Sequence, residues 1–397
     1  MSRVPAGGGA FAARFVVVDA ATTLAPGEIV WNRSGRIVAL RRPRGAIADV
    51  GVVPGLVNAH AHLQLAPLRV AERRFVPWLS AVMAGQASAT TAERRAAVAE
   101  AGATLAADGT AAVGEIDATG ESAAVLARGP LRGRCYRELT GFHLDGSGAR
   151  RLLRERVEAH AALPRGWSPH APYSVSAALF SAASRSRRWL AIHCAEVPEE
   201  QQFLATGQGP FADLLRRLGR LPTGFRAPGV GAVRWLERLG ALHARTLLVH
   251  CQELQRGDRA RIAGAGASIV VCPGTIDWFR RTPPPVASWL RAGIPVALGT
   301  DSRASNVALS MRRELARARA LWPDLRDAEL LAMATQNGGR ALGLPACGQL
   351  RMRGPADFVA IPARGTFAAT LEPFVAGATE PVAVFLGGRR VPGAPSR

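Results

Sequence analysis

The sequence has 397 residues, of which 48% are hydrophobic, enough to bury a large core. Its five cysteines exclude a disulfide-rich scaffold. No apolar run reaches the ~18 to 20 residues of a membrane span or resembles a secretory leader, so we expect a cytoplasmic protein. The formal net charge is +20, but the basic residues are arginines scattered along the chain, with no lysine among them. We therefore expect a solvated basic surface, without a nucleic-acid or membrane partner.

The first 50 residues predict short strands separated by turns, at 13–20, 28–32 and 35–42. Short apolar runs then alternate with stretches rich in Ala, Leu and Arg. Eight of these runs predict strands, which end at or near His60, Glu115, Glu138, His170, His193, His250, Cys272 and Asp301. Helical patterns lie between most of them, at about 92–107, 149–162, 177–186, 253–263, 285–292 and 309–321. Three more runs, at 348–353, 356–362 and 381–391, again predict short strands.

This alternation of strands and helices is typical of an α/β fold with a parallel sheet. Eight such units that close on themselves form a (β/α)₈ barrel, or TIM barrel, of about this size. We predict the barrel at 54–345, and we expect residues 1–53 and 346–397 to meet in one small β domain. The segment 205–244 is long for a connection between two barrel strands, and such loops often form lids.

Polar or ionisable residues stand at nearly every predicted strand end, where a (β/α)₈ barrel collects its catalytic groups. His60 and His62 form an H-x-H pair, and residues i and i+2 of a strand share a face. With His193 and Asp301 they offer three imidazoles and a carboxylate, which suit one divalent metal and leave room for a water. The metal would lower the pKa of that water to about 7. The alternatives are two surface histidines for the pair and a helix N-cap for Asp301.

Glu196 follows His193 by three residues and could reach the same water. A carboxyl there can take the proton of the water and deliver it to a ring nitrogen or a leaving amine. The alternative is an acidic residue at a helix start. His250 could hydrogen-bond the attacking water, ligate a second metal, or be a core histidine satisfied by hydrogen bonds. His170 is a candidate hydrogen-bond donor to the substrate, or a structural residue.

Four further residues are candidates for the lining of the pocket, each with a structural role as the alternative: Glu138, Trp78, Arg303 and Glu115. The sequence contains none of the motifs that are typical of several other catalytic and nucleotide-binding sites. The G-x-S-x-G elbow, the phosphate-binding loop with its lysine and the G-x-G-x-x-G turn after a strand are absent. The H-x-E…P-C-x-x-C set of the zinc nucleobase deaminases is also missing, so a deaminase here would be of the barrel type.

The chain closely resembles the amidohydrolase superfamily in five segments: P-G-L-V-N-A-H-A-H-L, S-P-H-A-P-Y-S-V-S, I-H-C-A-E, V-H-C and V-A-L-G-T-D-S-R-A-S-N. The resemblance implies one Zn²⁺ or Fe²⁺ ion bound by His60, His62, His193 and Asp301. It also implies that Glu196 shuttles the proton, that His250 polarises the water, and that Asp301 is a second proton acceptor. His170 would contact the substrate. Some superfamily members bridge two metals with a carboxylated lysine, and because this chain has no lysine we expect one metal. A homodimer is expected from the same resemblance.

Within the superfamily, the chain is most similar to the branch of chlorohydrolases and cytosine deaminases, and there to aminodeoxyfutalosine deaminase-like proteins. The segments F-V-P-W-L and T-G-Q-G-P-F-A-D-L-L-R-R-L-G carry this similarity. It implies hydrolytic deamination of a small-molecule substrate, a 6-aminopurine nucleoside of menaquinone synthesis. The chain departs from the branch at Gly274-Thr275-Ile276 and at Cys251-Gln252-Glu253. The alternatives are another hydrolysis of a C–N or C–Cl bond on a heterocycle, and a non-catalytic relative that binds a nucleoside.

Overall fold

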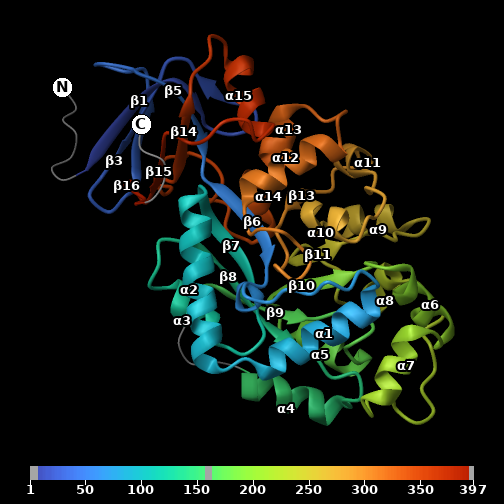
Figure 1. The fold of residues 1–397 in the computed structure, drawn as a ribbon. Coiled ribbons are helices and arrows are strands. Elements are labelled where there is room, and N and C mark those ends of the chain that lie inside the picture. Colours follow the sequence, from blue (N-terminus) through green and yellow to red (C-terminus); the bar gives the residue numbers. More distant parts are fainter. Residues whose placement is uncertain (1–7, 157–162, 393–397) are drawn as a thin grey trace.

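The computed structural model describes residues 8–156 and 163–392, whose strands form two sheets (Figure 1). The first sheet is parallel throughout and follows the order of the chain. Its strands are β6 (Leu56–Ala61), β7 (Thr110–Asp117), β8 (Arg132–Leu139), β9 (Arg165–Pro169), β10 (Trp189–Cys194), β11 (Thr246–His250), β12 (Ser268–Val271) and β13 (Val296–Leu298). An isolated parallel bridge between Ala61 and Asp301 joins the two outer strands, so the sheet is a nearly closed barrel. The predicted α/β barrel is confirmed.

Helices surround this sheet (Figure 1). They are α1 (Phe75–Ser88), α2 (Thr91–Ala107), α3 (Ser122–Leu126), α4 (Gly146–Arg156), α5 (Ala177–Arg185), α6 (Pro198–Thr206), α7 (Pro210–Arg217), α8 (Ala232–Arg238), α9 (Asp258–Ala265), α10 (Pro273–Trp278), α11 (Val286–Arg291), α12 (Met311–Leu321), α13 (Asp327–Met333) and α14 (Gln336–Ala341). A 3₁₀ turn covers Leu63–Leu65. The helix predicted at 149–162 is α4 up to Arg156, and residues 157–162 lie outside the described part of the chain. No helix of the described residues is long and apolar enough to cross a membrane.

The second sheet combines both ends of the chain, as predicted, and its strand order is β16-β15-β14-β5-β1-β3-β4, with β2 beside β1. Its strands are β1 (Gly9–Val17), β2 (Thr23–Leu24), β3 (Gly27–Trp31), β4 (Ile37–Arg41), β5 (Ala48–Pro54), β14 (Phe358–Pro362), β15 (Ala383–Leu386) and β16 (Arg389–Arg390). Helix α15 (Phe367–Val375) packs between this sheet and the barrel helices α12 and α13. The small sheet and the barrel are therefore held together by packed elements.

Two expectations about strands are wrong. Residues 348–353 form no strand, because the chain turns there and the N–H of Gly354 bonds back to the carbonyl of Arg351. Leu350 is nevertheless buried. The run V-V-P-G-L-V-N-A-H at 52–60, which we expected to be one barrel strand ending at His60, is divided between β5 of the small sheet, which includes residues 52–54, and β6 of the barrel. Both strands are apolar, and only Pro54-Gly55 marks the change of sheet. At Gly55 a Cβ would lie 2.6 Å from the Cβ of Ala111, so the close packing there requires glycine.

The barrel interior is filled by small and branched apolar side chains and one tyrosine, which precede the polar strand ends. They include Val57, Ala59, Ala112, Ile116, Tyr136, Ala191, Leu247, Val249, Val270 and Ala297. Since all strands are parallel, the residues that follow these positions gather at one end of the barrel. That end carries His60, His193, His250 and Asp301.

Candidate metal centre and active site

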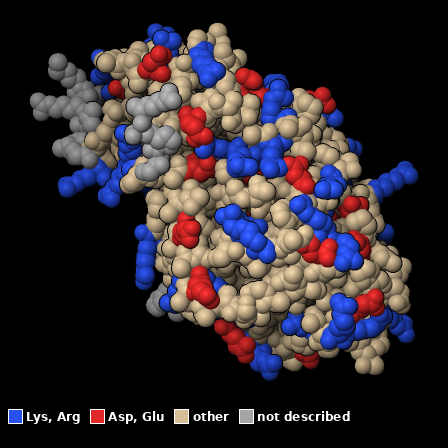
Figure 2. Space-filling view, in the orientation of Figure 1, with Lys and Arg blue, Asp and Glu red and all other residues tan. Residues whose placement is uncertain are grey.

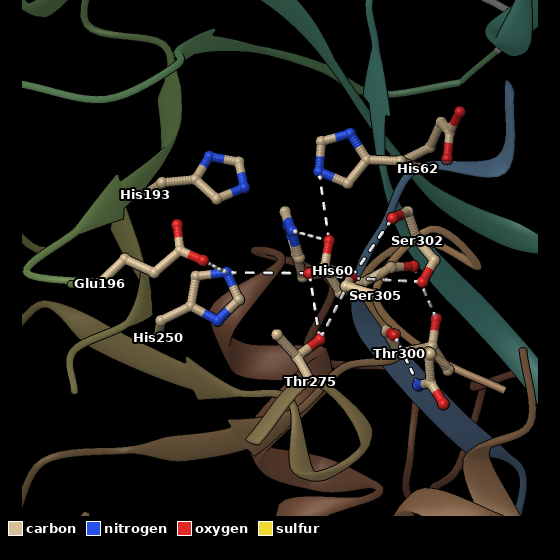
Figure 3. A network of polar contacts seen from close by, with 12 residues as sticks. His60, His62, His193, Glu196, His250, Thr275, Thr300, Ser302 and Ser305 are labelled. Atoms are coloured by element: carbon tan, nitrogen blue, oxygen red, sulfur yellow. Dashed lines mark hydrogen bonds and ion pairs between the residues drawn. The ribbon is translucent and has the colours of Figure 1, made fainter. Parts of the chain in front are cut away.

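Three histidines and one aspartate meet at the carboxyl ends of the barrel strands (Figure 3). His60 and His62 come from the end of β6, His193 from β10, and Asp301 from the turn after β13. One ligand atom from each of the four residues lies within 4.8 Å of the others. The Nε2 atoms of His60 and of His62 are each 3.6 Å from Oδ1 of Asp301. The four residues that the sequence predicted as metal ligands are thus brought together.

The backbone fixes the approach of β6 to the turn after β13. The N–H groups of Thr300 and Asp301 both donate to the carbonyl of His60, at 3.1 Å. Asn58 bonds to Thr300 twice, through its amide nitrogen at 2.8 Å and its amide oxygen at 3.1 Å. Asp301 has a φ of +55°, and a non-glycine residue in that region is strained unless its surroundings hold it. The turn is therefore set by bonds to β6.

Hydrogen bonds also orient the ligand groups themselves. Oδ2 of Asp301, the oxygen away from His60 and His62, accepts from Thr275 Oγ1 at 3.1 Å and from Ser305 Oγ at 2.8 Å. Nδ1 of His193 lies 3.1 Å from the carbonyl of His170, which leaves its Nε2 for a metal. Such partners behind the ligands fix ring orientation and tautomer in metal sites.

The electrostatics of the cluster fit a divalent cation. His60 is fully buried and neither of its ring nitrogens has a hydrogen-bond partner, a costly arrangement without a ligand. Burial lowers the pKa of His62 to about 3 and that of His193 well below its usual value, so both imidazoles are neutral, as a metal requires. Burial alone would raise the pKa of Asp301, but the imidazoles, His60 foremost, hold it well below its usual range. Three imidazole nitrogens and one carboxylate form a typical zinc set.

Glu196 and His250 lie directly beside this cluster (Figure 3). Oε1 of Glu196 is 3.6 Å from Nε2 of His250, which is 4.0 Å from Oδ2 of Asp301. Burial raises the pKa of Glu196 to about 8, although Arg281 opposes the shift. Burial lowers the pKa of His250 to about 3. A carboxyl with a pKa near neutrality is suited to gain and lose a proton during a reaction.

A cavity of about 380 Å³ opens above these groups. Its floor is polar, with His62, His193, Glu196, His250 and Asp301. Its walls are apolar and come mainly from α1 and α7, with Phe75, Trp78, Leu79, Val82, Met83, Phe211, Leu214, Leu215 and Leu218. Tyr173 stacks on Phe211 at a ring distance of 3.9 Å. The 205–244 segment therefore supplies one wall of the cavity, through α7.

The predicted substrate contacts divide into two groups. His170, Glu138 and Trp78 line the cavity, as expected of residues that contact a substrate. Trp78 donates from Nε1 to the carbonyl of Ala304 at 2.8 Å, so only its ring is available to a ligand. Arg303 is not brought into the cavity lining, and its guanidinium bonds to the carbonyl of Val307 at 3.3 Å.

Glu115 is also outside the cavity. Its carboxylate accepts from Ser122 Oγ at 2.8 Å and from the backbone N–H of Leu63 at 3.0 Å. It therefore supports the 3₁₀ turn after His62 rather than a substrate.

Sequence reasoning missed Arg281, whose Nη1 lies 3.5 Å from Oε1 of Glu196. It also missed Thr275 and Ser305, although the S-R-A-S-N that follows Asp301 did mark the segment containing Ser305. Nothing in the local sequence around Arg281 separates it from the many other arginines of the chain.

The chain matches the Amidohydrolase family over residues 52–391. It is 34% identical over 366 residues to the aminodeoxyfutalosine deaminase of Deinococcus radiodurans, covering 85% of this chain and 83% of that protein. Among solved structures, the Helicobacter pylori aminofutalosine deaminase in complex with methylthio-coformycin has a TM-score of 0.81 at 22% identity, covering 96% and 99% of the two chains. A zinc-bound adenosine deaminase from Xanthomonas campestris has a TM-score of 0.76 at 24% identity, covering 96% and 92%. The chain therefore belongs to the amidohydrolase family.

Proposed function

We propose that the protein is a metal-dependent deaminase that hydrolyses a C–N bond in a cyclic amidine, with an aminated purine-like ring as substrate. The observation that carries this proposal is the placement of Glu196 and His250 beside the four-residue cluster, on the floor of a cavity with apolar walls. Proton-transfer groups beside a water-activating site are what hydrolytic deamination requires.

In the proposed reaction, each group on the floor of the cavity has one task. His60, His62, His193 and Asp301 would hold one divalent metal, Zn²⁺ or Fe²⁺, which activates a water as a Lewis acid. His250 polarises the attacking water through Nε2. Glu196 accepts a proton of that water at its carboxylate and delivers it to the ring nitrogen. Asp301 accepts the second proton of the water and passes it to the departing amine, which leaves as ammonia. The net change is water consumed, a ring carbonyl formed and ammonia released.

For the substrate itself, we propose a 6-aminopurine nucleoside such as aminodeoxyfutalosine, which would place the enzyme in menaquinone synthesis. Similarity to the Deinococcus radiodurans aminodeoxyfutalosine deaminase supports this choice. The faces of Trp78, Phe211 and Tyr173 suit a planar ring, because offset stacking on aromatic side chains is favourable. His170 and Glu138 would bond to polar edges of the nucleoside, and the pKa of Glu138 is raised by burial to about 7, so it can donate or accept.

The test is ammonia release from a panel by the zinc- or iron-loaded protein. The panel holds aminodeoxyfutalosine, adenosine, S-adenosylhomocysteine, guanine, cytosine and an aminotriazine. We expect turnover of the aminopurine nucleosides, and aminodeoxyfutalosine to have the highest kcat/KM. Glu196→Gln should lower kcat by about 10² to 10⁴-fold and leave the metal content unchanged, because only the proton carrier is removed.

Each other outcome points to a different function. Full activity of Glu196→Gln would contradict the mechanism. No ammonia from the panel, with stoichiometric metal bound, would favour another ring hydrolysis such as dechlorination. No ammonia and no metal would favour a non-catalytic nucleoside-binding protein.

A further inference from the structure

Arg281 places a buried positive charge directly behind Glu196. It follows α10, in the connection after β12, and its Nη1 lies 3.5 Å from Oε1 of Glu196. The side chains of the two residues are 14% and 4% exposed. An ion pair this far from water is screened little, so the charge acts strongly on its partner.

Aromatic rings keep this guanidinium away from water. Its central carbon lies 4.5 Å from the ring centroid of Phe279 and 5.4 Å from that of Phe75. Cations over aromatic faces are attracted by the ring quadrupole. Nη1 and Nη2 are buried and have no hydrogen-bond partner, so the ion pair with Glu196 and the two rings are what compensates the charge. The cost of removing both charges from water offsets much of their attraction, so stability alone does not account for this buried pair.

Arg281 does not reach a ligand itself. Phe75 and Glu196 line the cavity, whereas Arg281 lies behind them. Arg281 forms its ion pair with Glu196, so its charge acts on a reaction foremost through this carboxylate, which is held at two further points. Its Oε1 faces Nε2 of His250 at 3.6 Å, and its backbone N–H donates to Oε2 of Glu200 at 2.8 Å.

We infer that Arg281 is a positioning residue for the deamination, which holds Oε1 of Glu196 beside His250 so that the carboxylate meets the attacking water in a fixed orientation. The inference rests on the proposed role of Glu196. It assigns a role to a side chain of the connection that follows β12. The burial of Glu196 favours its neutral form, and Arg281 opposes this by favouring the carboxylate, which is the form that accepts a proton.

Two substitutions separate the charge of Arg281 from its packing. Arg281→Met keeps a long apolar side chain against Phe75 and Phe279 and removes the charge. Arg281→Lys keeps the charge without the planar group. The matched control is Arg73→Gln, because the Arg73 guanidinium also stacks on an aromatic ring of this segment, Trp278 at 4.0 Å, but pairs with no catalytic group.

We expect Arg281→Met to lower kcat by about 10- to 100-fold with KM within about 3-fold of wild type, since the cavity is untouched. Arg281→Lys should recover much of the loss, and Arg73→Gln should match wild type. All three variants should have the metal content of wild type. They should also bind as many methylthio-coformycin molecules per chain as wild type, as measured by calorimetry. The thermal unfolding midpoint of each variant shows whether it folds. If Arg281→Met does not fold, the inference is tested by the kcat and the KM of Arg281→Lys, each compared with the wild-type value.

The results distinguish two failures. If wild type releases no ammonia from the panel, the proposed function fails. If wild type is active and Glu196→Gln is not, but Arg281→Met turns over at the wild-type rate, only the role of Arg281 is overturned. Equal losses of kcat in the Met and Lys variants would also overturn it, because the charge would then not be the determinant.

Discussion

The orientation of Asp301 depends on two hydroxyl groups that reach the carboxylate from behind. Thr275 and Ser305 donate to Oδ2, while Oδ1 faces His60 and His62. Thr275 belongs to the Gly274-Thr275-Ile276 segment, where the resemblance led us to expect a departure from the branch. In this chain, the hydroxyl of that segment bonds to a residue of the candidate metal site.

Thr275→Val should weaken metal binding by about 10-fold, the lower end for partners of a metal ligand, because Ser305 still donates to Asp301. Valine has nearly the shape of threonine, so only the hydrogen bond is lost. The measurement is zinc affinity by competition with a chelator. The control is Thr110→Val, at the start of β7, where the buried hydroxyl has no hydrogen-bond partner. Equal affinities of Thr275→Val and wild type would show that Thr275 does not orient the ligand.

Single residues at the strand ends were the most predictable part of the site. His60, His62, His193 and Asp301 could be predicted because apolar runs reveal strands and parallel strands bring their ends together. Arg303 was a candidate for the lining of the pocket, with a structural role as the alternative, and its side chain turns to the carbonyl of Val307. The direction of a loop side chain depends on tertiary contacts that local patterns do not contain.

At the scale of elements, periodicity predicted the barrel strands and most of the helices, but not where the chain changes sheets. β5 and β6 are both buried and apolar, so no contrast in polarity separates them. Leu350 is buried like a strand residue, although it lies outside any strand, just before a turn. In both places burial follows from tertiary packing rather than from secondary structure.

Helix α12 is tied to the strand ends by one buried carboxyl. Glu314 accepts from the N–H of Gly274 and from the amide of Asn306, each at 2.7 Å. These bonds fix the connections that carry Thr275 and Ser305. Burial raises the pKa of Glu314 to about 8, above the ordinary value of 4.5, although the two hydrogen bonds oppose the shift.

Because the folded protein holds this proton more tightly than the unfolded chain, the stabilisation is complete below pH 4.5 and is lost as pH rises through about 8. Glu314→Gln cannot titrate, so its free energy of unfolding should fall less between pH 5 and 9 than that of wild type. Each unit of pKa difference is worth about 1.4 kcal/mol. Urea unfolding at pH 5, 7 and 9 measures the slope, with the exposed Glu100→Gln as control. Parallel slopes for wild type and Glu314→Gln would refute the assignment.

At the scale of the whole molecule, charge is spread rather than gathered on the face that Figure 2 shows. On the face in Figure 2, arginines are interspersed with acidic side chains over both the small sheet and the barrel. Several arginines form ion pairs that link elements, such as Arg132 with Asp357 at 2.9 Å and Arg312 with Asp108 at 2.9 Å. This face therefore carries no continuous basic surface of the kind that tracks a phosphate backbone.

The barrel closes between β6 and β13 at a weak seam, and the four candidate metal ligands lie on both sides of it. β13 and β6 are joined by the bridge between Ala61 and Asp301 and by bonds of the turn to β6, rather than by a ladder along their length. His60 and His62 stand on one side of this seam and Asp301 on the other, with His193 across the barrel mouth. A bound metal would therefore connect the first and last strands and bind only the folded chain.

Removal of the metal should lower the stability of the whole barrel. Free zinc at about 100 times its dissociation constant stabilises the folded protein by about 2.7 kcal/mol. For a chain of this length we therefore expect dialysis against a chelator to lower the unfolding midpoint by about 3 °C. Added zinc should restore it, as followed by calorimetry. Asp301→Asn should respond less, since the seam loses its charged ligand, whereas His243→Gln, outside the site, should respond like wild type. A midpoint that is unchanged by the chelator would mean that the metal does not stabilise the seam.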